Sequence, residues 1–227
     1  MGIPSIAPYP MPTTAQLPVN LVGWRCDPAR SVLLVHDMQR YFLDFFHAGE
    51  PPLTTLVSNL RDLKEGAVAA GVPVIYTAQP GGMTRRQRGL LMDIWGPGMS
   101  KDPRERDIIP ELAPAEGDIV LTKWRYSAFA RSDLAETLGG LGRDQLIVGG
   151  VYAHVGCMIT ACDAFTEDIQ PFLVADAVAD FTPEYHHMAL RWAAERCAMI
   201  LPTRDLLQSL SRRVAENIMA GRSSSLQ

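Results

Sequence analysis

The sequence contains no long apolar segment and few cysteines. Nowhere do about 18 consecutive apolar residues occur, the length that a membrane-spanning helix needs. The N-terminus lacks the charged segment and the long apolar run of a secretory signal peptide. The four cysteines form no Cys-x-x-Cys pair, so neither a disulfide framework nor a zinc site is expected. We therefore predict a soluble, cytoplasmic protein with no membrane association.

The chain also lacks a concentration of positive charge and a set of histidines with metal-ligand spacing. The formal net charge is -4 and no stripe of lysine and arginine occurs, which argues against nucleic acid as a partner. The densest basic cluster, Arg85-Arg86-Gln87-Arg88, fits a solvated face and an anion site equally well. On a helix the adjacent His186 and His187 diverge, so no metal ion is expected. His154 is interpreted as a structural imidazole rather than a catalytic one.

What the sequence does contain is enough apolar residues for one large core. Hydrophobic residues make up 47% of the 227 residues, a length compatible with a single α/β domain. Prolines recur from Pro4 to Pro18 and prevent regular structure there. We expect one domain over residues 1–210, whose proline-rich arm at 1–20 packs on the domain or on a neighbouring subunit. Residues 211–227 are expected to form a partly flexible C-terminal extension.

Short apolar runs alternate with helical patterns along the chain, which predicts an α/β fold. Leucines and alanines at helical spacing between Leu56 and Ala70 predict a helix that ends at Gly71. Thr182 and Pro183 fit the start of a helix over Pro183–Arg196. Such alternation favours a parallel sheet with helices on both faces and a site at the carboxyl ends of the strands. The predicted strands are 31–35, 72–77, 119–122, 145–148, 172–175 and 198–201, and the other predicted helices are 132–138, 156–168 and a last one from about Thr203.

The most informative segment follows the fourth predicted strand. It reads Gly149-Gly150-Val151-Tyr152-Ala153-His154-Val155-Gly156-Cys157 and leads into a predicted helix. At such a turn the end of a strand and the free N–H groups of a helix converge. A cysteine at the head of that helix indicates a thiol hydrolase, whereas Gly156 in that place requires acid catalysis.

Two charged residues directly follow predicted strands. Asp37 comes after the first strand, where burial of a carboxylate is costly without a partner or a raised pKa. Lys123 comes after the third strand and reaches the same edge if these two strands are neighbours. The structural alternatives are a cap for Asp37 and a surface lysine for Lys123. Asp37 is our leading candidate for a catalytic acid, and Lys123 would orient a carboxylate or bind an anionic substrate.

Further polar and aromatic side chains lie close to these strand ends in the sequence. Gln79 follows the second strand in a segment rich in turn residues, and Phe42 follows Asp37 on a predicted loop. The segment Trp95-Gly96-Pro97-Gly98 predicts a tight loop that closes over the site, with Arg88 nearby. The aromatic residues after Lys123, which include Tyr126, are by themselves more typical of a core than of a ligand platform.

Four segments together match one family of enzymes. With them the chain resembles the isochorismatases of the isochorismatase-like hydrolase superfamily, from about Ile3 to Leu207. The resemblance implies a three-layer α-β-α fold with a six-stranded parallel sheet in the order 3-2-1-4-5-6. It also implies a cis bond between Val151 and Tyr152, and homodimers or larger homo-oligomers. The matching segments are His36-Asp37-Met38-Gln39, Tyr76-Thr77-Ala78-Gln79, the stretch from Leu121 to Phe129, and the stretch from Gly150 to Cys157.

The amidases of this superfamily use an Asp-Lys-Cys triad and often a metal near the second strand. Their motif places the nucleophilic cysteine at Gly156, one residue before Cys157, and no histidine-bearing metal segment follows Thr77. The resemblance therefore implies the isochorismatase branch, with no metal and no cofactor, and the missing side chain at Gly156 leaves room for a bulky ring. An amidase that uses Cys157 after a one-residue shift and a non-catalytic binding module are the alternatives.

The isochorismatase branch cleaves a vinyl ether, whose CH2 carbon accepts a proton so that water can add without a covalent enzyme intermediate. The resemblance implies that Asp37 is the general acid, with a pKa raised by an enclosed apolar setting. Lys123 would position or neutralise an anionic group of the substrate. The implied substrate-binding residues are Gln79, Arg88, Trp95, Tyr126, Tyr152, Phe42 and the backbone of Gly156.

Two chorismate-derived small molecules are implied as substrates. Isochorismate is cleaved in siderophore pathways and 2-amino-2-deoxyisochorismate in phenazine-type pathways, each with release of pyruvate. The other product is a dihydro-dihydroxybenzoate or a dihydro-hydroxyanthranilate, respectively. The segment Pro80–Thr84 looks closer to the phenazine type and Asp44-Phe45-Phe46 to the siderophore type, so both substrates stay open. Because the chain stops soon after Leu210, no fused carrier domain is expected.

Overall fold

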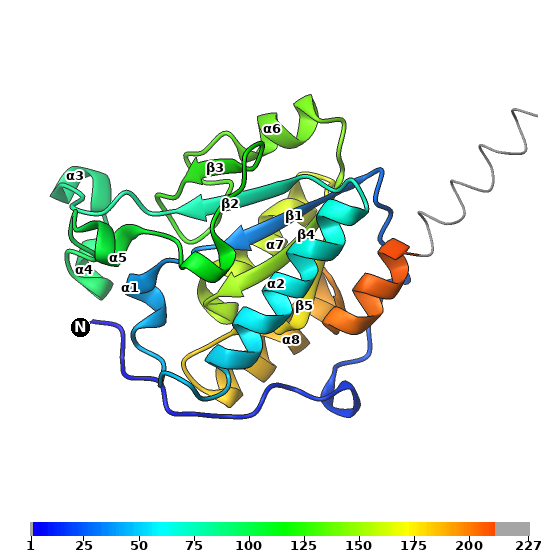
Figure 1. The fold of residues 1–227 in the computed structure, drawn as a ribbon, viewed down its shortest axis with the longest axis horizontal. Coiled ribbons are helices and arrows are strands. Elements are labelled where there is room, and N and C mark those ends of the chain that lie inside the picture. Colours follow the sequence, from blue (N-terminus) through cyan, green and yellow to red (C-terminus); the bar gives the residue numbers. More distant parts are fainter. Residues whose placement is uncertain (1, 212–227) are drawn as a thin grey trace, which may run out of the picture.

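The six strands found within residues 2–211 lie in one parallel sheet (Figure 1). The computed structural model describes residues 2–211. The strand order is β3-β2-β1-β4-β5-β6, so the predicted order is confirmed. β4 and β5 run further than predicted, since their apolar runs continue through glycine and alanine. The strands are β1 (Ser31–His36), β2 (Val74–Ala78), β3 (Ile119–Thr122), β4 (Gln145–Val151), β5 (Gln170–Ala179) and β6 (Met199–Leu201).

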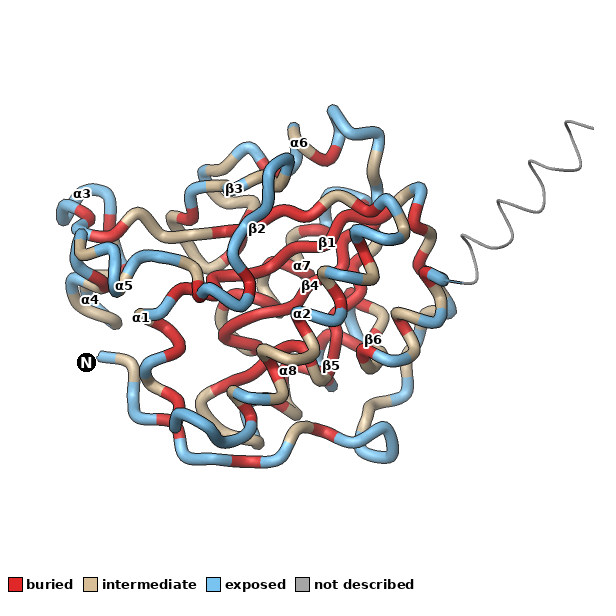
Figure 2. Tube along the Cα trace, in the orientation of Figure 1, coloured by how far each residue is buried: buried red, intermediate tan, exposed pale blue. Residues whose placement is uncertain are grey.

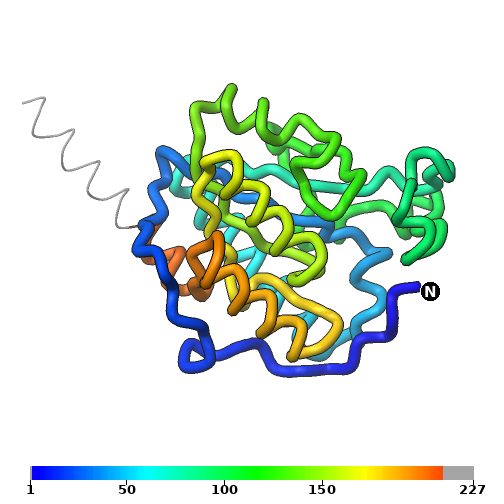
Figure 3. Tube along the Cα trace, turned by 180° about the vertical axis from the view of Figure 1, so that it is seen from behind, coloured from blue at the N-terminus to red at the C-terminus, as the bar shows by residue number. Residues whose placement is uncertain are grey.

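Helices cover both faces of the sheet and form two cores with it. α2 (Leu53–Ala69) packs on one face, together with the helical residues 203–211. α6 (Leu134–Gly140), α7 (Met158–Thr166) and α8 (Pro183–Arg196) pack on the other, which Figure 3 shows from behind. Side chains of β1 alternate between the two cores, as expected for a strand covered on both faces. The predicted three-layer fold is therefore confirmed, and Figure 2 shows that its buried residues concentrate in the strands.

The longer helices form where sequence spacing and capping residues favour them. In α2 the residues Leu56, Leu60, Leu63 and Ala67 are buried and share one face. Gly71 follows this helix with a φ of 68°, a left-handed conformation that glycine adopts without strain. At α8 the side chain of Thr182 accepts the Tyr185 N–H, which caps the N-terminus. The predicted ends of both helices are thus confirmed.

Several short helices lie beyond the carboxyl ends of β1 and β2, at the left of Figure 1. They are only four or five residues long, too short to show a repeating apolar pattern in the sequence. The predicted helix 156–168 begins with a π-type turn at Ala153–Cys157 (η3) before it continues as α7. The short elements are α1 (Arg40–Leu43), α3 (Arg85–Arg88), α4 (Leu91–Trp95), α5 (Pro103–Arg106) and the 3-10 turns η1 (Thr14–Gln16) and η2 (Pro110–Leu112).

The proline-rich arm packs on its own domain, along the lower edge of the molecule in Figure 1. Ile6 is completely buried and forms an isolated parallel bridge with Phe46. Asn20 pairs with Ile200 through two hydrogen bonds of 2.8 and 2.7 Å, which cover the edge strand β6. The predicted C-terminal extension lies, apart from residue 211, outside the described residues. Across residues 2–211 we find no helix with the length and apolar character needed to cross a membrane.

Candidate functional site

The chain turns sharply where β1 ends. Asp37 has a φ of 51°, in the left-handed region that aspartate tolerates better than most residues. Successive side chains of a regular strand point to opposite faces of the sheet. Here the turn lets two consecutive side chains, those of His36 and Asp37, line the same pocket.

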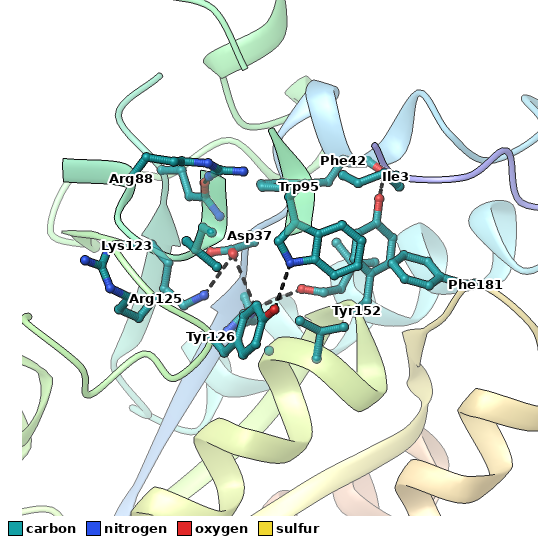
Figure 4. A pocket seen from close by; sticks show the side chains of 16 residues that line it. Ile3, Asp37, Phe42, Arg88, Trp95, Lys123, Arg125, Tyr126, Tyr152 and Phe181 are labelled. Carbon is teal, nitrogen blue, oxygen red and sulfur yellow. Dashed lines mark hydrogen bonds and ion pairs between the residues drawn. The ribbon is translucent and has the colours of Figure 1, made fainter. Parts of the chain in front are cut away.

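The carboxylate of Asp37 is buried and accepts hydrogen bonds at both oxygens. Oδ2 accepts from Lys123 Nζ at 3.0 Å and Oδ1 accepts from Thr77 Oγ1 at 2.6 Å. Asp37 and Lys123 are only 4% and 2% exposed, and Figure 4 shows them directed toward each other. The predicted proximity is confirmed, although the strands that carry the two residues are not neighbours in the sheet. β2 lies between β1 and β3, and the long lysine side chain spans it past Thr77.

The pKa of Asp37 is lowered, not raised as expected. Burial alone would raise the pKa of this carboxyl, but the Lys123 charge, His36 and the hydrogen bonds from Thr77 and Lys123 outweigh it. The carboxyl is therefore ionised at neutral pH in the ligand-free protein. The expectation of an apolar enclosure failed because a cation lies 3.0 Å away.

His36, to which the sequence analysis gave no role, forms the floor of the pocket. Its side chain is completely buried, and Nδ1 donates to the Val151 carbonyl oxygen at 2.9 Å. Burial and the nearby Lys123 charge lower the pKa of His36 to about 4, so the ring is neutral. A Cβ atom at Gly156 would lie 2.2 Å from Cε1 of this ring. The space left by the missing side chain is therefore filled by His36, which corrects the expectation that a substrate ring would fill it.

The strand-to-helix segment also needs glycine for a second close approach. A Cβ at Gly150 would lie 2.1 Å from the carbonyl oxygen of His36, and its φ of 130° is one that other residues rarely adopt. Glycine thus allows β1 and β4 to approach closely at their carboxyl ends. The bond between Val151 and Tyr152 is cis, as predicted.

One wall of the pocket is aromatic. The Tyr152 ring lies 4.5 Å from that of Phe181, and its hydroxyl donates to the Phe42 carbonyl oxygen at 2.6 Å. Trp95 Nε1 donates to the Tyr126 hydroxyl at 2.8 Å (Figure 4). Phe42 belongs to helix α1 and not to the predicted loop. Aromatic side chains from five separate segments thus enclose the space in front of Asp37.

The opposite wall is polar. Arg88 donates from Nη1 to Gln79 Oε1 and from Nε to the Gly96 carbonyl oxygen, both at 3.0 Å. Gln79 is itself held by Gln39, whose side-chain oxygen accepts the Gln79 N–H at 2.7 Å. Of the basic cluster at 85–88, Arg88 is buried in the pocket wall while the other two arginines are exposed. The solvated-face interpretation therefore fits Arg85 and Arg86, and Arg88 is the member of the cluster that lines the pocket.

Every residue assigned to the site from the sequence lines this one pocket. His36 and Arg125 could have been found as neighbours of Asp37 and Lys123 in the sequence. Ile3 and Phe181 gave no signal, because the arm has no periodic pattern and Phe181 follows the fifth strand beyond its predicted end. The lining residues that the sequence analysis missed are Ile3, His36, Leu91, Arg125, Val151, Val155 and Phe181.

Cys157 lies outside the pocket. Its side chain is completely buried in the core between the sheet and α7. Burial and the Asp37 charge raise the pKa of this thiol well above its usual value. A reactive cysteine needs a lowered pKa and access to substrate, so the structure argues against the amidase alternative.

His154 and His186 have structural partners. His154 Nδ1 lies 2.6 Å from Asp180 Oδ1, and this residue does not line the pocket. His186 lies within hydrogen-bond distance of the Tyr9 hydroxyl and the Ala175 carbonyl oxygen, at 3.2 and 2.9 Å. Within residues 2–211 no group of three or more His, Cys, Asp or Glu side chains is arranged to hold a metal ion.

The sheet order, with a buried acid at the end of β1, defines the isochorismatase-like fold. A solved cysteine hydrolase from Pseudomonas syringae pv. phaseolicola 1448A has this fold, with a TM-score of 0.76 and 23% identity over 85% of this chain and 98% of that one.

Comparison of sequences shows the family to which the chain belongs. The isochorismatase domain family matches residues 31–205. "Isochorismatase" of Bacillus subtilis (strain 168) is 55% identical over 216 residues, which cover 95% of this chain and 69% of the relative. "Phenazine biosynthesis protein PhzD" of Pseudomonas fluorescens is 55% identical over 206 residues, 91% of this chain and 99% of the relative. The chain belongs to the isochorismatase family and is a hydrolase.

Proposed function

We propose that the protein hydrolyses the enolpyruvyl vinyl ether of isochorismate or 2-amino-2-deoxyisochorismate and releases pyruvate. The observation that carries this proposal is the buried carboxylate of Asp37, paired with Lys123 and Thr77 in a pocket whose described lining contains no cysteine. The names of the two relatives, one an isochorismatase and one a phenazine biosynthesis protein, support both substrates equally.

The charges of the pocket suit a substrate with two carboxylates. Three cationic side chains, Arg88, Lys123 and Arg125, line it together with the single carboxylate of Asp37. Each of the proposed substrates carries two carboxylates, one on the ring and one on the enolpyruvyl group. A carboxylate that binds to Lys123 would weaken the pair with Asp37 and add negative charge nearby. Both effects raise the pKa of Asp37, so the proton needed for acid catalysis would bind together with the substrate.

Asp37 would then act at the terminal carbon of the enolpyruvyl group. It transfers its proton to the CH2 carbon, whose π electrons form the new C–H bond and leave a cation stabilised by the ether oxygen. The carboxylate that remains stabilises this cation electrostatically. Water adds to the cationic carbon, its proton returns to Asp37, and the resulting hemiketal collapses to pyruvate and the ring alcohol. The site therefore needs no covalent enzyme intermediate.

The aromatic wall would bind the ring of the substrate. Trp95, Tyr126 and Tyr152 present apolar surfaces with a few polar groups, a composition typical of pockets for small molecules. Trp95 and Tyr126 are joined by a hydrogen bond, which fixes both rings before the substrate binds. Such preorganisation reduces the entropy lost on binding.

The test is an assay of pyruvate release with isochorismate and with its 2-amino analogue at equal concentrations. We expect release with at least one of them, and the faster reaction identifies the better substrate. In water enriched in 18O the ring hydroxyl should keep 16O, because the bond that breaks joins the ether oxygen to the enolpyruvyl carbon. Absence of pyruvate with both substrates, or 18O in the ring hydroxyl, would contradict the proposal.

The oligomeric state and the cellular compartment of the enzyme are also proposals. We propose a homodimeric, cytoplasmic protein with one domain over residues 1–210 that needs no cofactor. Light scattering coupled to size-exclusion chromatography tests the dimer, and activity after dialysis against a chelator tests the independence from metal.

A further inference from the structure

His36 is a buried polar side chain that the proposed reaction does not use. Its Nδ1 lies 2.9 Å from the Val151 carbonyl oxygen and 3.8 Å from Asp37 Oδ2. A carbonyl oxygen can only accept, so the proton of the neutral ring is on Nδ1. Nε2 is fully enclosed and makes no hydrogen bond of normal geometry within residues 2–211; the Tyr126 backbone is the one backbone group besides Val151 that lies close enough to raise the pKa of the ring. An enclosed lone pair without a donor is costly, which calls for an explanation of this histidine.

The position of the His36 ring depends on Gly156. A Cβ at Gly156 would lie 2.2 Å from Cε1, 2.9 Å from Nε2 and 3.1 Å from Nδ1 of the ring. The ring cannot easily move away. Its Nδ1 is hydrogen-bonded to the Val151 carbonyl oxygen, and the backbone of His36 is in close contact with Gly150. His36 at the end of β1 and Gly156 in η3 therefore form a matched pair.

This pair lies directly next to the reacting carboxylate. Asp37 follows His36 in the chain and holds a left-handed backbone conformation, which is strained for an L residue. An immobile neighbour is the simplest way to maintain such a conformation. We propose that His36 is a positioning residue: its ring, seated against Gly156 and bonded to Val151, fixes the carboxyl group of Asp37 beside Lys123. This inference deepens the proposed function and rests on it.

Two substitutions of His36 separate its hydrogen bond from its bulk. His36→Asn keeps a donor at the place of Nδ1, whereas His36→Leu fills space without a donor. Misplacement of a reacting group by about 1 Å can cost about 100-fold in rate, so we expect His36→Leu to lower kcat by about 100-fold. KM should stay within about threefold, because in this role the ring acts on the reaction through Asp37. His36→Asn should restore kcat to within about tenfold of the natural protein.

His187→Leu, on α8 and outside the pocket lining, is the matched control and should leave kcat unchanged. Unfolding temperatures of all variants show whether each protein is folded at the assay temperature. A full kcat in His36→Leu, or a raised KM with an unchanged kcat, would overturn the positioning role.

A second experiment needs no substrate. Gly156→Ala should lower the unfolding temperature, because its methyl group collides with the His36 ring. In the double variant with His36→Ala the methyl group has space, so the double variant should be more stable than the sum of the two single effects predicts. Additive effects would overturn the pairing. Coupling in a protein that releases no pyruvate would instead overturn the proposed function and, with it, the positioning role, while the pairing itself would stand.

Discussion

At the scale of single residues, the site combines an acid with a cation that keeps it ionised. Asp37 and Lys123 could be predicted from the sequence because each directly follows an apolar strand. The contribution of His36 could not, because the direction of its side chain depends on the left-handed turn at Asp37. Thr77 was equally hidden, since its role follows from β2 lying between the strands that carry the other two residues.

Binding of an unreactive anionic analogue should raise the pKa of Asp37. In the ligand-free site this pKa lies below its ordinary value, so a proton that binds with the analogue must be taken up from solution. A lactyl ether in place of the enolpyruvyl group supplies such an analogue, and its affinity should fall as the pH rises. Calorimetry in buffers of different ionisation enthalpy measures the uptake, which should approach one proton per site.

Asp37→Asn is the control for this titration and should take up no proton. An uptake of zero by the natural protein, or the same uptake by both proteins, would exclude Asp37 as the group that titrates on binding.

At the scale of elements, the sequence predicted the long helices and missed the short ones. Helices such as α2 and α8 carry a full apolar stripe and recognisable caps. α1, α3 and α4 comprise four or five residues each and form no stripe. These three short helices nevertheless hold Phe42, Arg88 and Trp95, so the part of the fold that shapes the pocket was the part least visible in the sequence.

Helix α4 offers a direct test of the aromatic wall. Trp95→Leu removes the indole N–H that bonds to Tyr126 and part of the surface that would contact the substrate ring. Loss of about 1.4 kcal/mol of binding corresponds to about a tenfold rise in KM, and kcat should change by less than about threefold. Steady-state kinetics of pyruvate release provide both values.

Ile94→Ala, on the same helix at a side chain 52% exposed, is the matched control and should leave KM unchanged. A loss confined to kcat in Trp95→Leu would show that the indole acts in the chemical step and not in binding.

At the scale of the whole molecule, the alternation of strands and helices predicted the layers but not the order of the strands. Apolar runs alone do not reveal which strands pair, so the order came from the resemblance to a family. The contacts of the N-terminal arm could not be predicted for a different reason. Its contacts, such as the bridge between Ile6 and Phe46, arise from tertiary packing of an irregular segment. Ile3, which lines the pocket, shows that this arm contributes to the site.

The stability of the whole fold should fall steeply in mild acid. The pKa values of His36 and His186 are lowered to about 4, and burial is the largest cause in both cases. An unfolded histidine has a pKa of about 6.5. Between these values the unfolded chain binds more protons, so the free energy of unfolding should decrease as the pH falls from about 6.5 to 4. Each histidine contributes up to about 1.4 kcal/mol per pH unit.

Denaturant unfolding at several pH values measures this slope. His186→Asn changes a histidine outside the pocket. It should reduce the slope of the unfolding free energy against pH by up to about 1.4 kcal/mol per pH unit, the contribution of one proton. An unfolding free energy that is constant between about pH 7 and 5 would contradict the prediction.

The central claim, acid catalysis by Asp37 without a thiol, is tested most directly by the rate of pyruvate release from the better of the two substrates. The natural protein is compared with Asp37→Asn and with Cys157→Ser. General acid catalysis is worth about 100- to 10,000-fold, so Asp37→Asn should lower kcat by at least about 100-fold. Cys157→Ser should retain kcat within about threefold, because this side chain lies in the core and not in the pocket. Loss of pyruvate release in a folded Cys157→Ser protein, with activity preserved in Asp37→Asn, would contradict the account.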